Sequence, residues 1–349
     1  NPEIRMQDIS TNYFDRDANH ELQIGLRWQP PSYGELSEKT EKARVAWWDE
    51  KVKTSELRGK LIYTIRSLYT ELQMLAERAA FAAKRADLEN RRLAAVTSLV
   101  QLGQRPFLER VKLQAKALKA TREAELFAAR RTAQSERLAG LIGERGAFAV
   151  EPMKTEIQAY AWNGVREIAL RERPETAQAK AVQAYEAARY RAARLALVPA
   201  FSFVELGYHY ESKKKDSGEL LFGIELPLFN WNLGELRATT IERTNRTVWA
   251  EAAKAKIEDE LKEAFGRYRE ARQEFLAIEE NAKEARAALP GLIANAERGA
   301  LPEDERLELQ LALLDLDETN LEARYQLLSA VNELCRAAGA ESPAALSAD

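Results

Sequence analysis

Two hydrophobic periods alternate along the chain, and the change from one to the other occurs at similar places in its two halves. Between Glu219 and Leu228, apolar residues occupy every second position, as in a strand with one apolar face. After Gly234 the chain is rich in Ala, Glu and Arg, and apolar residues recur every three or four positions, as in a helix. The same succession runs from Glu21 through Gly34. The pattern predicts short strands that each lead into a long helix.

An internal duplication accounts for this succession. ELQIGLRWQPPSYGELSEKT, which begins at Glu21, matches ELLFGIELPLFNWNLGELRATT, which begins at Glu219. Further along, GQRPFLERVKLQ from Gly103 aligns without gaps with GALPEDERLELQ from Gly299. Each copy therefore predicts a strand, a long helix, a tight turn and a returning helix.

Each copy also contains a β-hairpin, because a second alternating segment precedes each strand. The apolar face of the four strands is predicted to consist of Leu22, Ile24, Leu26, Trp28, Val204, Leu206, Tyr208, Tyr210, Leu220, Phe222, Ile224 and Leu226. Strands of roughly 9–11 residues can cross a bilayer when tilted. The alternative is a small soluble sheet packed against a helix, although the helices have little spare apolar surface to cover it. Since four strands cannot close a barrel and lipid tolerates no open edge, several protomers would have to share one barrel.

Long helices account for most of the remaining sequence. From about residue 37 to residue 102 the pattern is helical, and roughly 65 residues of helix would be about 100 Å long. Within it, apolar residues from Leu57 through Leu61 to Ala86 follow an a/d spacing. Gly103 and Gly299 are predicted to end the long helices. Pro106 and Pro302 fit the first turn of the returning helices.

Composition narrows the functional classes. The 349 residues are 31% charged and 46% hydrophobic, which is typical of coiled coils and long helices. A net charge of -3 without a concentrated basic face argues against nucleic-acid binding. The single cysteine, Cys335, excludes an intrachain disulfide and a cysteine metal cluster, and we expect a packed thiol. With two histidines and no catalytic motif, we expect no enzyme, no cofactor and no metal site.

No segment approaches the roughly 20 apolar residues of a membrane-spanning helix, and no signal peptide is recognisable. The sequence opens with NPEIRMQDIS and lacks an initiator Met. We therefore expect a processed, truncated or partly ordered chain, in which a helix equivalent to residues 174–199 is missing before the first strand.

In the order of its motifs, the chain resembles the TolC-type outer-membrane efflux protein family. These motifs are RPETAQAKAVQAYEAARYRAARLALVPAFSF, FGIELPLFNWNLGELRA, the paired glycine turns and EARYQLLSAVNELCRAAG. The first strand region is similar to the heavy-metal-efflux, CzcC-like branch. The resemblance implies a mainly α fold with membrane β structure. Long antiparallel helical hairpins would form an α-barrel tunnel, and four strands per protomer would contribute to a twelve-stranded barrel shared by a homotrimer.

The expected segments follow from this resemblance and from the duplication. They are a first transmembrane β-hairpin (residues 1–31), a first long helical hairpin (32–142), equatorial short helices (143–173), a helix leading to the second hairpin (174–199), a second transmembrane β-hairpin (200–229), a second long helical hairpin (230–339) and a C-terminal tail (340–349).

The resemblance also implies a function, namely a passive exit duct in the Gram-negative outer membrane that extends into the periplasm. Its partners would be outer-membrane lipid, a periplasmic adaptor (membrane fusion protein) and, through the assembly, an inner-membrane RND or ABC transporter. Glu305 and Glu308, six and nine residues after the second turn's glycine, would form a cation-selective pore constriction. The turns would dock the adaptor through Gly103, Gln104, Arg105, Pro106, Gly299, Ala300, Leu301 and Pro302.

Two other functions compete with the channel. The chain could be the periplasmic adaptor itself, which also has a long helical hairpin, but a Gly- and Val-rich β domain is absent from the sequence. It could also be a structural coiled-coil protein that never meets a membrane. That alternative predicts no trimeric barrel and solubility without detergent.

Overall fold

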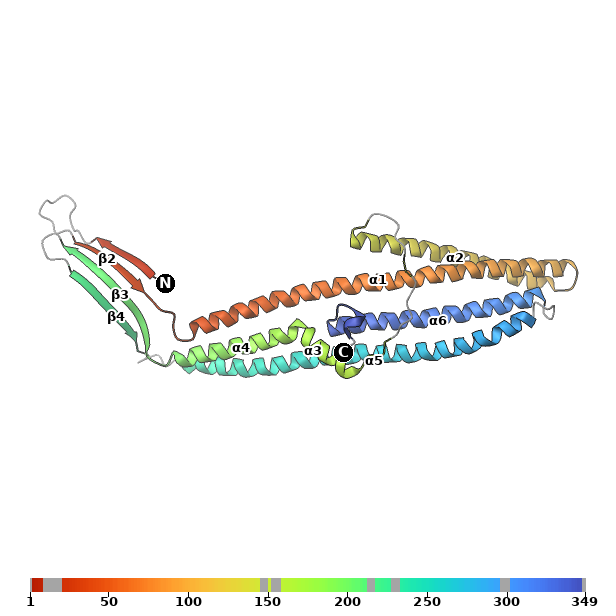
Figure 1. Ribbon diagram of the computed structural model, residues 1–349. Helices are drawn as coiled ribbons and strands as arrows, with labels where there is room; N and C mark the ends of the chain where they lie inside the picture. The colour runs from red at the N-terminus through yellow and green to blue at the C-terminus, as the bar shows by residue number, and fades with distance from the viewer. Residues whose placement is uncertain are drawn as a thin grey trace. The chain divides into compact units, whose positions relative to one another are not determined.

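The computed structural model describes residues 2–8, 21–144, 150–151, 158–211, 217–226, 233–295 and 302–346. It divides into two compact units, one of residues 1–54 and 174–255 and the other of residues 55–173 and 256–349. Helices α1 (Glu35–Gln101) and α5 (Leu233–Asn295) each continue from one unit into the other. Figure 1 colours the chain from red at the N-terminus to blue at the C-terminus, so that β2 and α1 are red to orange, β3 and β4 are green and α6 is blue.

The helices repeat with the spacing of the sequence duplication. Helix α2 spans Phe107–Ile142 and α6 spans Glu303–Ala338, and each has 36 residues. The first residues of α2 and α6 are 196 positions apart in the sequence (303 − 107), and so are their last residues (338 − 142). The preceding helices, α1 and α5, have 67 and 63 residues. At 1.5 Å per residue, each of these is about 100 Å long.

The strands β1 (Pro2–Asp8), β2 (Glu21–Trp28), β3 (Ala200–Glu211) and β4 (Ser217–Glu225) form one antiparallel sheet in the order β1-β2-β3-β4. Because β2 pairs directly with β3, the hairpins of the two copies join into a single sheet. The mainly helical fold with a small four-stranded sheet is therefore confirmed. The strands contain 7, 8, 12 and 9 residues, a wider range than the pattern predicts.

The turn that leads from β2 into α1 packs closely against α4 (Pro174–Leu195). Gly34 has a φ of 89°, and a Cβ atom at this position would lie 2.9 Å from the Cα of Ala192. A hydrogen-bonded turn precedes α1, because Ser32 donates to the Glu35 carboxylate from its N–H (3.0 Å) and its hydroxyl (2.8 Å), and the Glu35 N–H donates to the Ser32 carbonyl (3.1 Å). Hydrogen bonds from Lys39 and Ser32 lower the pKa of Glu35 to about 2. A glycine and the hydrogen-bonded turn between Ser32 and Glu35 thus fix the start of the first long helix.

The largest buried core lies where α5 and α6 pack with α3 (Trp162–Glu172). Leu261, Leu327 and Leu334 are fully buried there. The hydroxyl of Tyr268 donates a 2.8 Å hydrogen bond to the carbonyl of Gln158, which satisfies a polar group inside this apolar core. Two residues that follow α6 in sequence, Ala340 and Leu346, also belong to this core, and Leu346 lies in the short 3-10 helix η2 (Pro343–Leu346).

Cys335 lies in this core with 2% of its surface exposed, so the expected packed thiol is confirmed. Burial raises the pKa of the thiol to about 11. The neutral thiol is therefore the form that the core favours.

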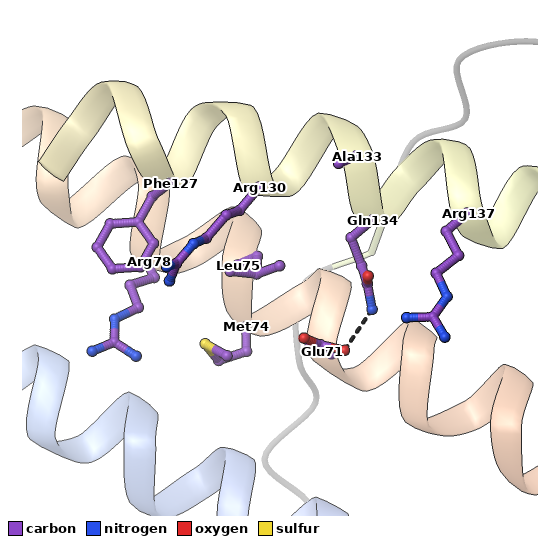
Figure 2. Close-up of a pocket in the computed structure, with 9 residues that line it drawn as sticks. All are labelled: Glu71, Met74, Leu75, Arg78, Phe127, Arg130, Ala133, Gln134 and Arg137. Carbon is purple, nitrogen blue, oxygen red and sulfur yellow. Dashed lines mark hydrogen bonds between the residues drawn. The ribbon is translucent and has the colours of Figure 1, made fainter. Parts of the chain in front are cut away.

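Helices α1 and α2 make a smaller core of Leu68, Leu72 and Leu138. Beside it, the amide of Gln134 donates a 2.5 Å hydrogen bond to the Glu71 carboxylate (Figure 2). The first part of the predicted a/d row is not buried within the chain, because Leu57 and Leu61 are 69% and 50% exposed. The helical period was predicted correctly for this part of α1. A periodic pattern does not show, however, whether another helix of the same chain covers the apolar side chains.

Among the described helices, none is both long enough and apolar enough to span a bilayer.

Candidate channel surfaces

The register of the sheet gathers the predicted apolar residues on one face. Directly opposed residues of antiparallel strands point to the same side of a sheet. The opposed pairs are Leu22 with Tyr210, Ile24 with Tyr208, Leu26 with Leu206, Trp28 with Val204, Val204 with Phe222, and Leu206 with Leu220. Apart from Leu22, whose side chain lies outside the description, and half-buried Val204, these side chains are exposed. No described helix covers this face, which we call the apolar face.

A bulge adds an aromatic residue that simple alternation assigns to the opposite face. The pairing of β3 with β4 shifts between Phe201 and Phe203, so that Phe201 is opposed to Ile224. The rings of Phe201 and Phe222 are 6.4 Å apart on the apolar face. The sequence around Ser202 has no glycine or turn motif from which this bulge could have been predicted.

The edges of the apolar face also differ from the sequence expectation. Ile4 on β1 is opposed to Leu26 and is 76% exposed, so it extends the face although it was not among the predicted residues. Leu226 was predicted to belong to the face but follows the last residue of β4. It is nevertheless exposed, so the apolar surface continues past the strand end.

The opposite face of the sheet is polar. The Arg27 guanidinium lies 3.7 Å from the Glu205 carboxylate and 3.7 Å from the centre of the Phe203 ring. Further along β3, His209 Nε2 lies 3.7 Å from a Glu219 carboxylate oxygen. One side of the sheet thus has the chemistry of an aqueous surface and the other that of a surface normally kept from water. Exposed apolar surface of this kind marks contact with a membrane or with another protein.

The first turn between long helices is built by Gly103. Its φ is 74°, the Gly103 N–H bonds to the Val100 carbonyl, and the Gln104 N–H bonds to the Leu99 carbonyl. These two bonds form a Schellman motif, which ends α1 as predicted. Of the corresponding positions in the second turn, Gly299, Ala300 and Leu301 lie outside the described residues.

The prolines of the two turns occupy N-cap positions, one residue earlier than predicted. Pro106 has φ −68° and ψ 142°, and Pro302 has φ −57° and ψ 153°, so both are extended and precede their helices. The backbone of each proline ends the turn, and the returning helix begins at the next residue. Both prolines are exposed, as is Gln104.

Charged side chains connect the first turn to the start of α6. Arg105 lies 3.1 Å from Asp304 and 3.5 Å from Glu109. Asp304 is 5% exposed and was not among the predicted site residues. Carboxylates are favoured at this place because the first turn of a helix is its positive end.

The two predicted constriction residues have different surroundings. Glu305 is exposed in the first turn of α6. Glu308 is also exposed, but its carboxylate accepts a 2.8 Å hydrogen bond from Arg92 of α1. In the single chain, therefore, Glu308 is neutralised by a neighbour, whereas the charge of Glu305 faces solvent.

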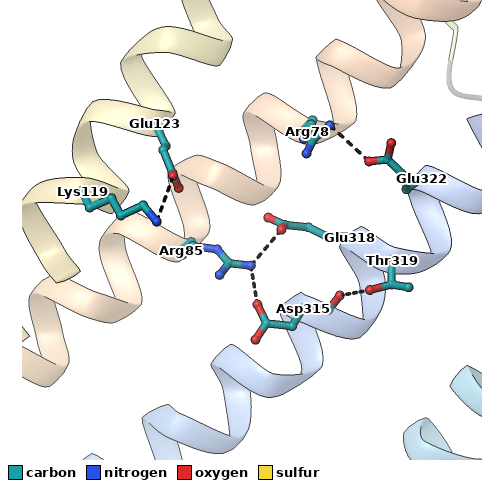
Figure 3. Close-up of polar contacts among 8 residues, drawn as sticks. All are labelled: Arg78, Arg85, Lys119, Glu123, Asp315, Glu318, Thr319 and Glu322. Atoms are coloured by element: carbon teal, nitrogen blue, oxygen red, sulfur yellow. Dashed lines mark hydrogen bonds and ion pairs between the residues drawn. The ribbon is translucent and has the colours of Figure 1, made fainter.

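The bond between Arg92 and Glu308 is one step of a regular series that joins α1 to α6. The steps are Arg78 with Glu322 at 3.2 Å, Arg85 with Asp315 at 2.5 Å and Arg92 with Glu308 at 2.8 Å. Each step of seven residues forward on α1 meets a step of seven back on α6, as expected of antiparallel helices with a heptad pattern. Arg85 also donates a 2.8 Å bond to Glu318 (Figure 3). We call this series the arginine ladder.

Within the described parts of the chain, no group of three or more His, Cys, Asp or Glu side chains is arranged to hold a metal ion.

Comparison with known proteins gives a result at the level of structure. No protein-family model matches the sequence, and no curated protein matches it. Among solved structures, CusC, described for its transmembrane channel formation, has a TM-score of 0.68 at 16% identity, with 97% of this chain and 83% of that chain covered. The open Neisseria gonorrhoeae MtrE outer membrane channel has a TM-score of 0.68 at 17% identity, with 98% and 80% covered.

The Vibrio cholerae outer membrane protein VceC is similar at a TM-score of 0.66 and 15% identity, with 97% of this chain and 86% of that chain covered. The fold is that of outer-membrane channels. The TolC-type architecture indicated by the motifs is thus confirmed, while membership of the heavy-metal-efflux branch stays a prediction. At these identities the likeness concerns the fold, and the function has to be argued from the surfaces described above.

Proposed function

We propose that this chain is the outer-membrane channel of a tripartite efflux or type I secretion system, a passive exit duct and not an enzyme. The observation that carries the proposal is the two-faced sheet, whose apolar face is left uncovered by the described helices. In water such a face would cause aggregation, whereas in lipid it is stable. The likeness to outer-membrane channels of known structure supports the same function.

The dimensions of the apolar face suit an outer membrane. On β3 the apolar row runs from Phe201 to Tyr210, which is roughly 30 Å of extended chain. With a tilt of about 40°, the row would be about 23 Å tall, close to the ~25 Å apolar band of outer-membrane barrels.

The sheet has two edges, β1 and β4, and lipid cannot hydrogen-bond their backbone groups. Pairing β4 of one protomer with β1 of the next removes both edges. A homotrimer built in this way has a closed barrel of twelve strands. In the same assembly the long helices would form the α-barrel tunnel through the periplasm.

A charge placed on each face of β3 tests this arrangement. Leu206→Lys would put a cation against lipid at a cost of roughly 2–4 kcal/mol, so heat-sensitive trimers should disappear from the membrane fraction. The matched control, His209→Lys, changes the polar face of the same strand and should leave the trimers intact. Mass measurement after detergent extraction counts the subunits. A wild-type monomer that is soluble in plain buffer would exclude the channel.

We further propose that Glu305 and Glu308 form the cation-selective constriction. Because Arg92 neutralises Glu308, Glu305 should contribute most of the negative charge. Single-channel recordings of Glu305→Gln plus Glu308→Gln should therefore show reduced cation selectivity and weaker divalent block, with Glu305→Gln alone giving most of the effect. Glu303→Gln, in the same helical turn, is the control. Unchanged selectivity of the double variant would remove these residues from the constriction.

The exposed turns are proposed to dock a periplasmic adaptor, which connects to an RND or ABC transporter of the inner membrane. They comprise residues 103–106 and 299–302. Gln104→Trp, at an exposed position without a glycine-only conformation, should abolish export while trimers assemble normally. Lys116→Trp, at an exposed position on the lysine-rich side of α2, is the control. Full export by Gln104→Trp would place the docking surface elsewhere.

A further inference from the structure

The seam between α1 and α2 contains a cavity of about 490 Å³ that the channel function does not use. Figure 2 shows its walls, with Met74, Leu75 and Arg78 on α1 facing Phe127 and Arg130 on α2. All of its lining residues belong to the same compact unit. Its volume lies within the range of roughly 300–1,000 Å³ that is typical of small-molecule sites.

The cavity arises from an interruption in the packing of α2. The residues that α2 buries are Leu113, Ala117, Ala120, Gln134 and Leu138. Between Ala120 and Gln134 no residue of α2 is buried, and the α2 residues that line the cavity there are Phe127, Arg130 and Ala133. An arginine keeps its head group in water while its stem lies along apolar surface, so it does not fill the seam as a leucine would.

The walls carry an excess of positive charge. Arg78 is paired with Glu322, and Glu71 is held by the amide of Gln134. Across the described residues, no carboxylate forms an ion pair with Arg130 or with Arg137, which also lines the cavity. Three guanidinium groups and two carboxylates leave a local charge of one positive unit.

Two of these guanidinium groups lie close to the same aromatic ring. The guanidinium carbons of Arg78 and Arg130 lie 5.0 and 5.8 Å from the centre of the Phe127 ring. Two cations on one ring repel each other unless an anion lies between or beside them. The same ring, together with Met74 and Leu75, gives the cavity an apolar wall.

We propose that this cavity binds an amphipathic organic monoanion, a carboxylate or sulfonate on an apolar body. Arg130 and Arg137 would hold the acid group, because guanidinium donors match the oxygens of a carboxylate or sulfonate. The apolar body would lie against Phe127, Met74 and Leu75. This inference is independent of the export function, since it concerns one helix pair within a single protomer.

Titration calorimetry with 4-phenylbutyrate on the purified full-length protein in an uncharged detergent tests the proposal, with a titration into protein-free detergent subtracted. One anion should bind per chain. The neutral analogue 4-phenylbutan-1-ol and inorganic phosphate should each bind at least tenfold more weakly. If the alcohol binds as tightly as 4-phenylbutyrate, the cavity recognises only the apolar body. If phosphate binds as tightly, the cavity recognises only the charge of the anion. Either result overturns the proposal.

Variants locate the site. Arg130→Gln plus Arg137→Gln should weaken the binding of 4-phenylbutyrate at least tenfold. Arg122→Gln plus Arg131→Gln, an equal change of charge at exposed positions outside the cavity, should alter the binding less than twofold. Ala133→Phe fills the cavity without changing charge and should also reduce binding at least tenfold. An unchanged thermal transition identifies variants that fold. If folded Ala133→Phe binds like wild type, the anion is not bound in this cavity.

Discussion

The two returning helices occupy equivalent places in the duplicated unit, yet they are packed very differently. Helix α6 buries 13 residues, whereas α2, of the same length, buries five. Leu314 of α6 is 1% exposed, and its counterpart 196 positions earlier, Leu118 of α2, is 56% exposed. Two copies of one ancestral pattern have therefore acquired different roles, one as the centre of a protomer's core and the other as a surface.

The surface of α2 is unusually apolar for a helix in water. Its exposed large apolar residues are Phe107, Leu108, Val111, Leu118, Leu126, Leu141 and Ile142, whereas the described residues of α6 include none. An isolated protomer would lose stability by exposing this surface, and a neighbouring subunit would recover it. The proposed homotrimer would account for this difference between the two copies.

The difference in packing between α2 and α6 can be tested most directly at the matched residues Leu118 and Leu314. Leu314→Ala removes a fully packed side chain and should lower the free energy of unfolding by about 2–5 kcal/mol. Leu118→Ala should change the unfolding of the dissociated chain by less than about 0.5 kcal/mol, because an exposed leucine has little packing to lose. Denaturant unfolding followed by circular dichroism measures both. Equal losses would contradict the different roles of the two helices.

A second matched pair lies where strands lead into long helices. Gly34→Ala places a Cβ atom 2.9 Å from the Cα of Ala192 at a φ of 89°, and should lower the free energy of unfolding by about 1–3 kcal/mol. Its counterpart, Gly234, lies in the first turn of α5 with open space around it. Gly234→Ala should therefore be neutral or stabilise by up to about 1 kcal/mol. Thermal unfolding of both variants decides the sign, and a destabilised Gly234→Ala would count against this difference.

The arginine ladder gives a smaller effect. Arg85→Gln removes a partly buried cation that bonds to Asp315 and Glu318, and should lower the free energy of unfolding by about 1 kcal/mol. Lys283→Gln on α5 is the control, because the ion pair that the described residues show for Lys283 is with Glu279 of the same helix, and Lys283 is 70% exposed. A double-mutant cycle with Asp315→Asn measures the coupling across the helices. A coupling energy indistinguishable from zero would show that the ladder adds no stability.

The smallest expected effect concerns the thiol of Cys335, whose counterpart in α2 is Ala139. Because burial raises the pKa of Cys335 to about 11, the unfolded chain loses this proton at lower pH than the folded chain. The contribution of the thiol is present below its ordinary pKa near 9 and should be lost as the pH rises to 11. Stability should therefore fall over this range, and less so in Cys335→Ala.

A thiol reagent provides the matching measurement. At pH 8, native wild-type protein should remain unmodified, and denatured protein should take up one equivalent. Ala139→Cys in a Cys335→Ala background should react in the native state, since position 139 is only half-buried. Rapid modification of native Cys335 would show that its core opens readily.

Much of the fold was predictable because its signals are local. Alternation from Leu220 to Ile224 predicts a strand with one apolar face, and Gly103 predicts the end of α1. The bulge at Phe201 was not predictable, since it depends on pairing with β4 and is not marked by a special residue. Nor was the change of role of α2, because a heptad pattern is the same whether its own chain or another subunit covers it.

The charged site shows the same limit. The sequence places Glu305 and Glu308 near a turn, but Arg92 neutralises Glu308 from a position 216 residues away in the chain. Asp304 was not among the predicted site residues for a similar reason, since its partner Arg105 lies 199 residues away, in the other copy. The spacing of Arg78, Arg85 and Arg92 is visible in the sequence, but the carboxylates that meet them become evident only after the helices are paired.

The regular spacing of the arginine ladder also limits how α1 and α6 can move. A shift of α6 along α1 by one residue misaligns every charged pair at once. The next position that restores the pairing is seven residues away, a displacement of about 10 Å. Gradual sliding of α6 along α1 is therefore opposed along the whole row of charged pairs.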